Sequence, residues 1–119
     1  MCGRFNVLSS AQGFVDLLEI LVKIDPRLDN AARYNIAPTQ RVLAVRRPER
    51  EFDPEMIELR WGFIPHWAKD SSIGSRMINA RSETAATKPS FRNAYTGTRC
   101  LIAADGWYEW RNLTTSKRP

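Results

Sequence analysis

Cys2 stands one residue from the start of the chain, where a thiol has chemistry that an internal cysteine lacks. If Met1 is removed, Cys2 carries a free α-amine beside its thiol and becomes a 1,2-aminothiol. An aldehyde condenses with the amine to an imine, and the neighbouring sulfur then closes a five-membered thiazolidine ring. Amines and thiols of this kind both have nucleophilic populations near neutral pH. The sequence therefore predicts aldehyde capture by Cys2, and packing as a small hydrophobic side chain is the alternative.

Asn79 and Arg81 place an amide and a guanidinium two residues apart. In an extended segment this spacing points both side chains to the same face, so Asn79 can hydrogen-bond a reacting group while Arg81 holds a neighbouring phosphate. The alternative is a surface ion pair between Arg81 and Glu83, which shares the same spacing and adds little stability.

Glu109 is a carboxylate flanked by three aromatic residues, namely Trp107, Tyr108 and Trp110. An apolar surrounding disfavours the ionised form of a carboxyl group, which predicts a role in proton transfer near neutral pH. The alternative is a strand glutamate whose side chain simply faces water.

Two further side chains are candidates for ligand contacts. Trp67 follows Pro65 in a segment broken by Gly and Pro, and it is predicted to stack on a base or, alternatively, to cover the core. Asn35 lies in an irregular stretch and either contacts a ligand or bonds its own turn backbone. His66 is the only histidine, and we expect it to be a surface residue without a catalytic role.

Composition limits the class of protein. The 119 residues, 43% of them hydrophobic, suit one globular domain. There is no apolar run of about 20 residues and no secretory signal at the start, so we expect an intracellular protein that does not cross a membrane. The two cysteines, Cys2 and Cys100, are expected as thiols. With no CxxC motif and one histidine, neither a metal nor a cofactor is expected.

The net charge of +5 is concentrated in the second half, since residues 60–119 carry 10 Lys and Arg against 4 Asp and Glu. Basic residues there alternate with tryptophans, a mixture suited to phosphates and stacked bases. The residues concerned are Arg76, Arg81, Arg92, Arg99 and Arg111, with Trp61, Trp67, Trp107 and Trp110. We therefore expect a nucleic-acid partner, and a merely soluble basic surface is the alternative.

In the first half, we expect a strand at residues 2–5, and the S-x-x-Q spacing from Ser9 predicts a capping box that opens a core helix. Its apolar positions run to Leu21, and the helix should end before Asp25. Residues 25–40 look irregular. An apolar run at 42–45 predicts a strand buried on both faces, and alternation at 57–61 predicts its half-exposed hairpin partner. The predicted apolar face of the helix comprises Phe14, Val15, Leu17, Leu18 and Leu21.

In the second half, residues 69–75 read as a polar, mobile loop. Thr87 is predicted to cap a helix that runs to Tyr95, with Pro89 in its first turn. A buried strand should follow at 99–104, with Cys100 as inert packing. Residues 112–119 are expected to form a loop or part of a hairpin.

Five motifs taken together resemble one known family, the SOS response-associated peptidase (SRAP) domain. The motifs are Cys2-Gly3-Arg4-Phe5, Tyr34-Asn35-Ile36-Ala37-Pro38-Thr39, Trp61-Gly62-Phe63-Ile64-Pro65, Asn79-Ala80-Arg81-Ser82-Glu83-Thr84 and Ala104-Asp105-Gly106-Trp107-Tyr108-Glu109-Trp110. They occur in order from Cys2 to Trp110. Members of this family crosslink themselves to abasic sites in single-stranded DNA and shield them.

The resemblance implies a set of site residues. Cys2 matches the residue that captures the ring-opened aldehyde of an abasic sugar, and Glu109 matches the carboxylate that assists proton transfer. The remaining matches concern DNA contacts: the pair Asn79 and Arg81 hold the lesion and its phosphates, Trp67 stacks on a flanking base, and Arg4, Asn35 and Pro38 line the same cleft.

The resemblance also implies an α+β fold, with a curved, barrel-like antiparallel sheet and helices packed outside. In this family a histidine and a further arginine from the second half of the domain join the site, and the sequence ends before either. We therefore expect residues 1–119 to form the N-terminal portion of a single SRAP-like domain, with an open sheet edge that can pair with another copy. The resemblance places such a protein in the cytoplasm or nucleoid of a bacterium, or in a eukaryotic nucleus.

Two other functions remain open. Cys2 is the potential nucleophile of a thiol peptidase or self-processing hydrolase, although the sequence lacks the usual activating histidine. The chain is alternatively a non-covalent module that binds single-stranded DNA. The residues leave open whether an abasic site is cleaved, which base context is preferred and what the oligomeric state is.

Overall fold

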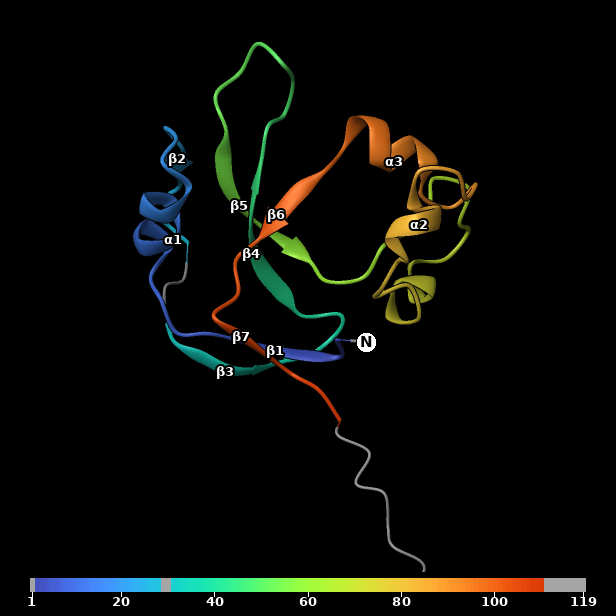
Figure 1. The fold of residues 1–119 in the computed structure, drawn as a ribbon, viewed down its shortest axis with the longest axis horizontal. Coiled ribbons are helices and arrows are strands. Elements are labelled where there is room, and N and C mark those ends of the chain that lie inside the picture. The colour runs from blue at the N-terminus through green and yellow to red at the C-terminus, as the bar shows by residue number, and fades with distance from the viewer. Residues whose placement is uncertain (1, 29–30, 111–119) are drawn as a thin grey trace, which may run out of the picture.

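The computed structural model describes residues 2–28 and 31–110 (Figure 1). In chain order the strands and helices are β1 (Arg4–Val7), α1 (Ala11–Leu18), β2 (Lys23–Ile24), β3 (Arg33–Ile36), β4 (Arg41–Arg46), β5 (Glu55–Arg60), the 3-10 helix η1 (Ser71–Ser75), α2 (Ser82–Ala85), α3 (Arg92–Gly97), β6 (Cys100–Ile102) and β7 (Gly106–Tyr108). Met1 and the predicted loop or hairpin at 112–119 lie outside the described residues.

The strands form two small sheets. One has the order β3-β1-β7 and is antiparallel throughout. The other has the order β2-β5-β4-β6, in which only the β2–β5 pair is parallel. Helix α1 packs beside the sheets, whereas α2 and α3 form a separate lobe (Figure 1). The sheets do not close into a barrel within the described residues, so the predicted α+β class with an incomplete, barrel-like sheet is confirmed.

Strand β4 lies between the two halves of the core. Because side chains of a strand alternate between its faces, Val42 joins one cluster while Leu43 and Val45 join the other. All four central residues of β4 are buried, as predicted, and the antiparallel hairpin with β5 is confirmed by a register that runs from the Arg41–Arg60 pair to the Arg46–Glu55 pair. Burying one such aliphatic side chain stabilises the fold by about 1.5–3 kcal/mol.

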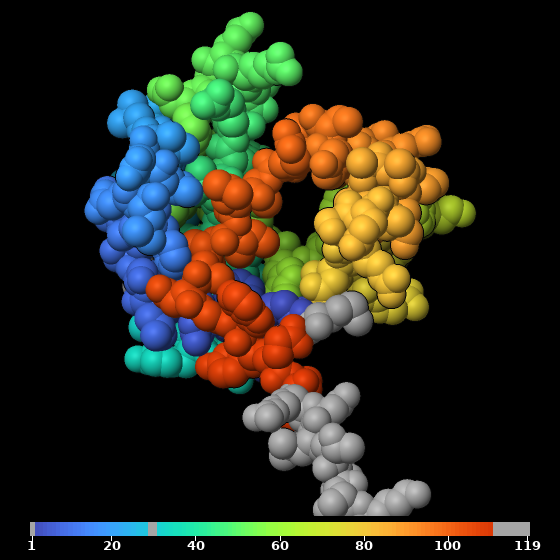
Figure 2. Space-filling view, in the orientation of Figure 1, coloured from blue at the N-terminus to red at the C-terminus, as the bar shows by residue number. Residues whose placement is uncertain are grey.

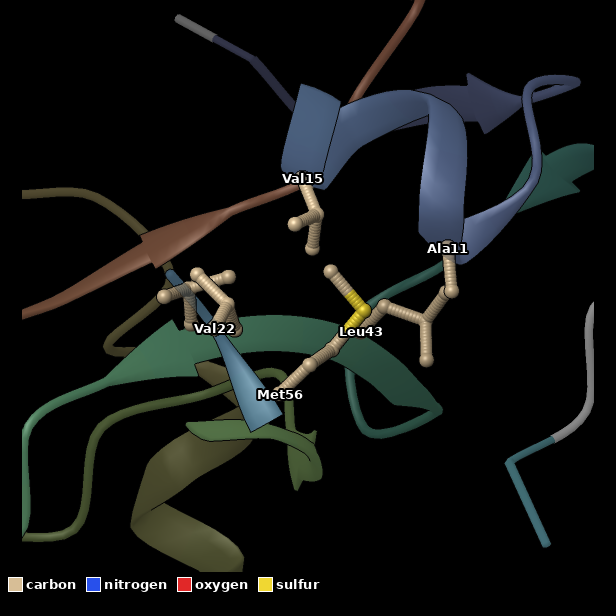
Figure 3. Close-up of a cluster of buried hydrophobic side chains, with 6 residues drawn as sticks. Ala11, Val15, Val22, Leu43 and Met56 are labelled. Atoms are coloured by element: carbon tan, nitrogen blue, oxygen red, sulfur yellow. The ribbon is translucent and has the colours of Figure 1, made fainter. Parts of the chain in front are cut away.

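The first cluster lies under α1, where the helix residues Ala11 and Val15 face Leu43 and Met56 (Figure 3). The second cluster lies beside β1. In it the ring of Phe5 meets that of Trp61 edge-on, with 5.0 Å between the ring centroids. This second cluster is the part of the core that contacts Cys2.

Helix α1 is shorter than predicted and begins one residue later. Ser10, not Ser9, is the N-cap, and its hydroxyl accepts a hydrogen bond from the backbone N–H of Gly13. The helix ends at Leu18, so Leu21 lies beyond it. Both Leu17 and Leu21 are exposed. The expectation that these two leucines pack in the core is therefore wrong.

Two other predictions in the first half are corrected. The segment 25–40 is not wholly irregular, because β3 forms there through pairing of Ile36 with Phe5 of β1. The first strand covers Arg4–Val7 and not residues 2–5. Both differences arise from pairing with distant strands, which supplies backbone hydrogen bonds that local sequence does not encode.

Only the second part of the predicted helix over residues 87–95 is confirmed, because α3 begins at Arg92 and a separate short helix, α2, ends at Ala85. The hydroxyl of Thr87 donates to the carbonyl of Thr84 and caps no helix. Pro89 explains the break, because a proline disfavours helical conformation in the residue before it. The polar stretch 69–75, predicted to be a loop, contains η1, whose N-cap is Asp70.

Strand β6 is not buried as predicted. Cys100, Leu101 and Ile102 are all exposed, because β6 is the last strand of its sheet and pairs only with β4 among the described residues. Cys100 is thus not packed in the core, although desolvation raises the pKa of its thiol. No helix within residues 2–28 and 31–110 is long and apolar enough to span a membrane.

Candidate functional site

Cys2 lies two residues before β1, the central strand of the sheet β3-β1-β7. Its side chain is partly buried and packs against the cluster that contains Phe5 and Trp61. The thiol donates a weak hydrogen bond to the carbonyl oxygen of Arg4, with 3.5 Å between sulfur and oxygen. The thiol therefore contacts the core and still reaches the surface.

Asn79 lies directly beside Cys2. Its side-chain Nδ2 donates a hydrogen bond of 3.0 Å to the carbonyl oxygen of Cys2. The backbone that carries Asn79 is held by two bonds from the motif at 61–63: the N–H of Phe63 donates to the carbonyl of Met77 at 2.9 Å, and the indole N–H of Trp61 donates to that of Ile78 at 3.4 Å. The Trp61-Gly62-Phe63 motif and the segment that leads to Asn79 thus meet beside Cys2.

A close contact between two glycines fixes this arrangement. Gly62 has a φ of 131°, in the region that favours glycine, and a Cβ atom there would lie 2.4 Å from the carbonyl oxygen of Gly74. Gly74 belongs to η1, whose N-cap Asp70 accepts a hydrogen bond from the N–H of Ser72. The glycine of the Trp61-Gly62-Phe63 motif therefore lets η1 approach the segment that leads to Asn79.

Arg4 and Asn35 form a second contact of the candidate site. Pairing of β1 with β3 brings them together, and Nη1 of Arg4 donates to Oδ1 of Asn35 at 2.9 Å. Pro38 follows in the next turn, where Thr39 has a φ of 76° and its N–H donates to the carbonyl of Trp61. Asn35 thus bonds a cation on a neighbouring strand, which neither of its two predicted roles included.

Glu109 follows β7, on the other side of β1. The register of β1 with β7 pairs Arg4 with Tyr108, so Glu109 reaches the same end of the sheet as Arg4. A cleft of about 920 Å³ lies here and is lined by Gly3, Arg4, Tyr34, Asn35, Tyr108, Glu109 and Trp110. We call it the aromatic cleft. The rings that flank Glu109 are exposed and do not enclose its carboxylate, contrary to the apolar surrounding that the sequence suggested.

Arg81 and Trp67 are placed differently. Arg81 is exposed and stands at the N-cap of α2, two residues along the chain from Asn79. Trp67 is about half exposed, and His66 beside it is exposed as expected. Neither Arg81 nor Trp67 lines the aromatic cleft. The structure therefore brings Cys2 to Asn79 and places Arg4, Asn35 and Glu109 around one cleft. The other three candidates, Pro38, Trp67 and Arg81, do not line that cleft.

A groove of about 470 Å³ separates the α2–α3 lobe from strands β4, β5 and β6, and the hollow beside the lobe is visible in Figure 2. Asn79 lines this groove together with Trp61 and apolar side chains of both walls, including Phe63, Ile78 and Ile102. Asn79 therefore faces a groove on one side and contacts Cys2 on the other.

Asp105 is a residue of structural importance that sequence reasoning missed. Its carboxylate accepts hydrogen bonds from the backbone N–H groups of Leu8 and Ser9 and from the Ser9 hydroxyl, at 2.5, 2.9 and 2.6 Å. These bonds, led by that from the Ser9 side chain, lower the pKa of Asp105. They fasten the turn before β7 to the end of β1, which positions Glu109. The dipeptide Asp105-Gly106 was the available signal, because Asp-Gly marks turns.

Within residues 2–28 and 31–110, no group of three or more His, Cys, Asp or Glu side chains is arranged to hold a metal ion.

Comparison with protein families matches residues 1–119 to the family described as "SOS response associated peptidase (SRAP)". Among curated proteins, the chain is 41% identical over 118 residues to "Abasic site processing protein YoaM" of Bacillus subtilis (strain 168), covering 99% of this chain and 51% of that protein. It is 34% identical over 121 residues to "Abasic site processing protein YedK" of Escherichia coli (strain K12), covering 100% of this chain and 52% of that protein.

Among solved structures, a crystal structure of a Bordetella bronchiseptica protein matches with a TM-score of 0.65 at 26% identity. The match covers 91% of this chain and 50% of the other. The chain thus spans about half the length of the curated relatives and of the solved structure that it matches.

Proposed function

The chain belongs to the SOS response-associated peptidase (SRAP) family, and from this premise we propose that it processes abasic sites in single-stranded DNA. In this proposal Cys2, freed by removal of Met1, forms a covalent thiazolidine with the ring-opened aldehyde of the abasic sugar. Relatives named abasic site processing proteins support the substrate class. The proposed substrate places the protein where DNA is, in the cytoplasm or nucleoid of a bacterium or the nucleus of a eukaryote.

The observation that carries the proposal is the hydrogen bond from Asn79 to the carbonyl oxygen of Cys2. A terminal residue ordinarily frays, because only one peptide bond holds it. Here the carbonyl of Cys2 is anchored by a side chain, and the following residues enter β1. In the processed chain the amine and the thiol would remain as the two reactive groups on an ordered residue.

The proposed reaction has two bond-forming steps. The amine of Cys2 attacks the aldehyde carbon, and loss of water gives an imine. The sulfur then attacks the imine carbon, so that a C–S bond forms, the C=N bond becomes single and the thiol proton ends on nitrogen. The sum is one aldehyde and one aminothiol converted into a thiazolidine and water. Ring closure is favoured because both nucleophiles are on one residue.

Each remaining candidate has a role in this scheme. Glu109 carries protons during loss of water and ring closure. Arg4 and Arg81 contact phosphates, with Arg4 oriented by Asn35. Trp67 stacks on a flanking base. Pro38 shapes the turn after β3, beside Trp61.

A denaturing gel tests the covalent step. Protein mixed with abasic single-stranded DNA should give a slower band that survives heating, and Cys2→Ala should abolish it. Because Cys2→Ala keeps the terminal amine, an imine should still be trapped by borohydride in that variant. A heat-stable band of unchanged yield with Cys2→Ala would overturn the role of the thiol.

A second experiment keeps Met1 in place. A tag placed before Met1 blocks the amine, so no adduct is expected with or without borohydride. Intact mass of the untagged protein should show loss of Met1, and on addition of the abasic strand a gain equal to that strand less one water. A gain equal to the whole strand would point to simple addition without ring closure.

A further inference from the structure

The aromatic cleft has the size and lining of a ligand site. Its volume of about 920 Å³ falls within the range of about 300–1,000 Å³ that small-molecule sites occupy. Three of its lining residues carry rings, one carries a guanidinium and one a carboxylate. This combination of flat apolar faces and a few polar groups suits a planar ligand with polar edges.

The rings of the cleft are exposed to an unusual degree for aromatic side chains. Tyr34, Tyr108 and Trp110 have exposed fractions of 67%, 51% and 97%. Exposed apolar surface gathered in one place indicates a binding surface. The ring of Tyr108 is also held in place, because its hydroxyl donates a 2.7 Å hydrogen bond to the carbonyl of Tyr34 and its backbone pairs with Arg4. A ring fixed in this way loses little entropy when it stacks on a ligand.

Arg4, beside the rings, favours a nucleotide as the ligand of a cleft that also holds the Glu109 carboxylate. Arg4 is exposed and directed by its bond to Asn35, so it presents a positive charge at the edge of the rings. Aromatic faces beside an arginine form the usual surface for unpaired nucleotides, in which the rings stack on bases and the cation meets the backbone. Cys2 precedes Arg4 by two residues, a distance of about 7 Å in extended chain. A strand that reacts at Cys2 therefore reaches the cleft with a neighbouring nucleotide.

We propose that the aromatic cleft is a stacking subsite for one unpaired base, the neighbour of the abasic nucleotide on one side. This inference rests on the proposed function, because the strand is assumed to react at Cys2. The subsite reads no particular base, since every base offers a flat face to the rings of Tyr108 and Trp110. It differs from the stacking role proposed for Trp67, which does not line the cleft.

The test varies the DNA at the two neighbours of the abasic site. Oligonucleotides carry a base on both sides, or an unreactive tetrahydrofuran spacer in place of the 5′ or the 3′ neighbour. Binding is measured with Cys2→Ala, which forms no stable adduct, and crosslinking with the unaltered protein. A spacer on one side should weaken binding about 5- to 150-fold, the range expected for loss of one stacked base. Equal affinity for all three strands would overturn the subsite.

Variants assign the effect to the cleft. Trp110→Ala, in the Cys2→Ala background, should weaken binding of the strand with both bases and abolish the penalty of the spacer. Trp110→Phe is the matched control, because it keeps an aromatic face at the same position and should retain most of the spacer penalty. Trp110 is almost fully exposed, so its truncation removes no buried contact and thermal melting should be unchanged. A spacer penalty that persists undiminished in Trp110→Ala would place the base elsewhere and overturn the inference.

The outcomes separate this inference from the proposed function. If no adduct forms with the unaltered protein but the spacer penalty depends on Trp110, the cleft binds bases and the covalent proposal fails. The opposite outcome is that an adduct forms and that neither its rate of formation nor the DNA affinity depends on the neighbouring bases or on Trp110→Ala. The covalent proposal then stands and the subsite is overturned.

Discussion

The side-chain amide of Asn79 donates a hydrogen bond to the backbone carbonyl of Cys2 across 77 positions of sequence. The bond holds the main chain of the residue that we propose as the terminus of the processed chain. It engages neither the sulfur nor the nitrogen of Cys2. A side chain outside the sheet thus orders Cys2 and leaves the two groups of the proposed reaction unengaged by this bond.

Asn79→Ala should slow crosslinking to an abasic strand about 2- to 10-fold, which corresponds to the ~0.5–1.5 kcal/mol of one net hydrogen bond. Asn79→Asp should be slower still, because a carboxylate cannot donate to the carbonyl and repels it. The rate is measured from gels under single-turnover conditions. Asn93→Ala, on the exposed side of α3, is the control and should react normally. A normal rate for both Asn79 variants would leave the bond without a role in the reaction.

Glu109→Gln should lower the rate of adduct formation without weakening DNA binding. Glutamine keeps the size and hydrogen-bonding reach of the side chain and loses its ability to carry a proton, a loss that costs about 10²–10⁴-fold where general acid-base catalysis operates. The measurement pairs a binding titration with the single-turnover rate of adduct formation. Glu83→Gln, on the exposed surface of α2, is the matched control. An equal loss of binding and rate would instead indicate a role in holding the strand.

Local patterns predicted the hairpin of β4 and β5, because alternation and a short turn are properties of adjacent residues. They did not predict β3, which exists through pairing with β1 some thirty positions away, or the exposure of Leu17, which depends on where the sheet lies relative to α1. Strand β6 was expected to be buried because Leu101 and Ile102 are apolar, yet composition does not say whether a neighbour covers a strand.

For the candidate site, too, local sequence predicted some features, and others depended on contacts between distant residues. The types of its residues were available from the motifs, but the contact of Arg4 with Asn35 required the register of two strands. The bonds of Asp105 to Ser9 cross 96 positions and had no local signal beyond a turn dipeptide.

Asp105→Asn should destabilise the protein at neutral pH and lose this effect in acid. Bonds from Ser9 lower the pKa of Asp105 below its ordinary value of 3.8. A lowered pKa contributes stability that is present above 3.8 and is lost as the pH falls through the folded-state value. The difference in melting temperature between the two proteins should therefore be constant from pH 8 to about 5 and shrink below 3.8.

Comparing Asp105→Asn with the unaltered protein cancels the effect of the other acidic residues on the melting temperature. The pKa of Asp25 is also lowered, to about 2, by its bonds with Arg27, and it titrates in the same range in both proteins. A difference in melting temperature that stays the same down to pH 2 would show that the charge of Asp105 does not hold the turn before β7.

Within residues 2–28 and 31–110, β6 pairs on one side only, and this open edge should allow the chain to self-associate. Unpaired backbone groups on an apolar edge strand are a template for another strand, and Leu101 is 58% exposed there. Sedimentation should show oligomers at high concentration that Leu101→Lys reduces, because a lysine at an edge opposes pairing. Leu17→Lys is the control, since Leu17 is also an exposed leucine but lies on α1. The same decrease with both variants would attribute association to general surface hydrophobicity.

Gly62→Ala should destabilise the fold by at least about 1–3 kcal/mol and slow crosslinking as well. A residue other than glycine is strained at a φ of 131°, and the added Cβ would lie 2.4 Å from the backbone oxygen of Gly74, which cannot rotate away. Relief requires η1 and the strand end at Trp61 to separate, which displaces the bonds from Phe63 and Trp61 that hold the segment of Asn79. Urea unfolding gives the stability.

The crosslinking rate of Gly62→Ala is measured well below its melting temperature, so that the folded fraction is complete. Gly97→Ala is the matched control, because no atom lies within 4 Å of a Cβ built there and its stability should be unchanged or raised by about 0.4–1 kcal/mol. If Gly62→Ala lost stability but reacted normally when folded, the close approach of Gly62 to Gly74 would support the fold without positioning Asn79 at Cys2.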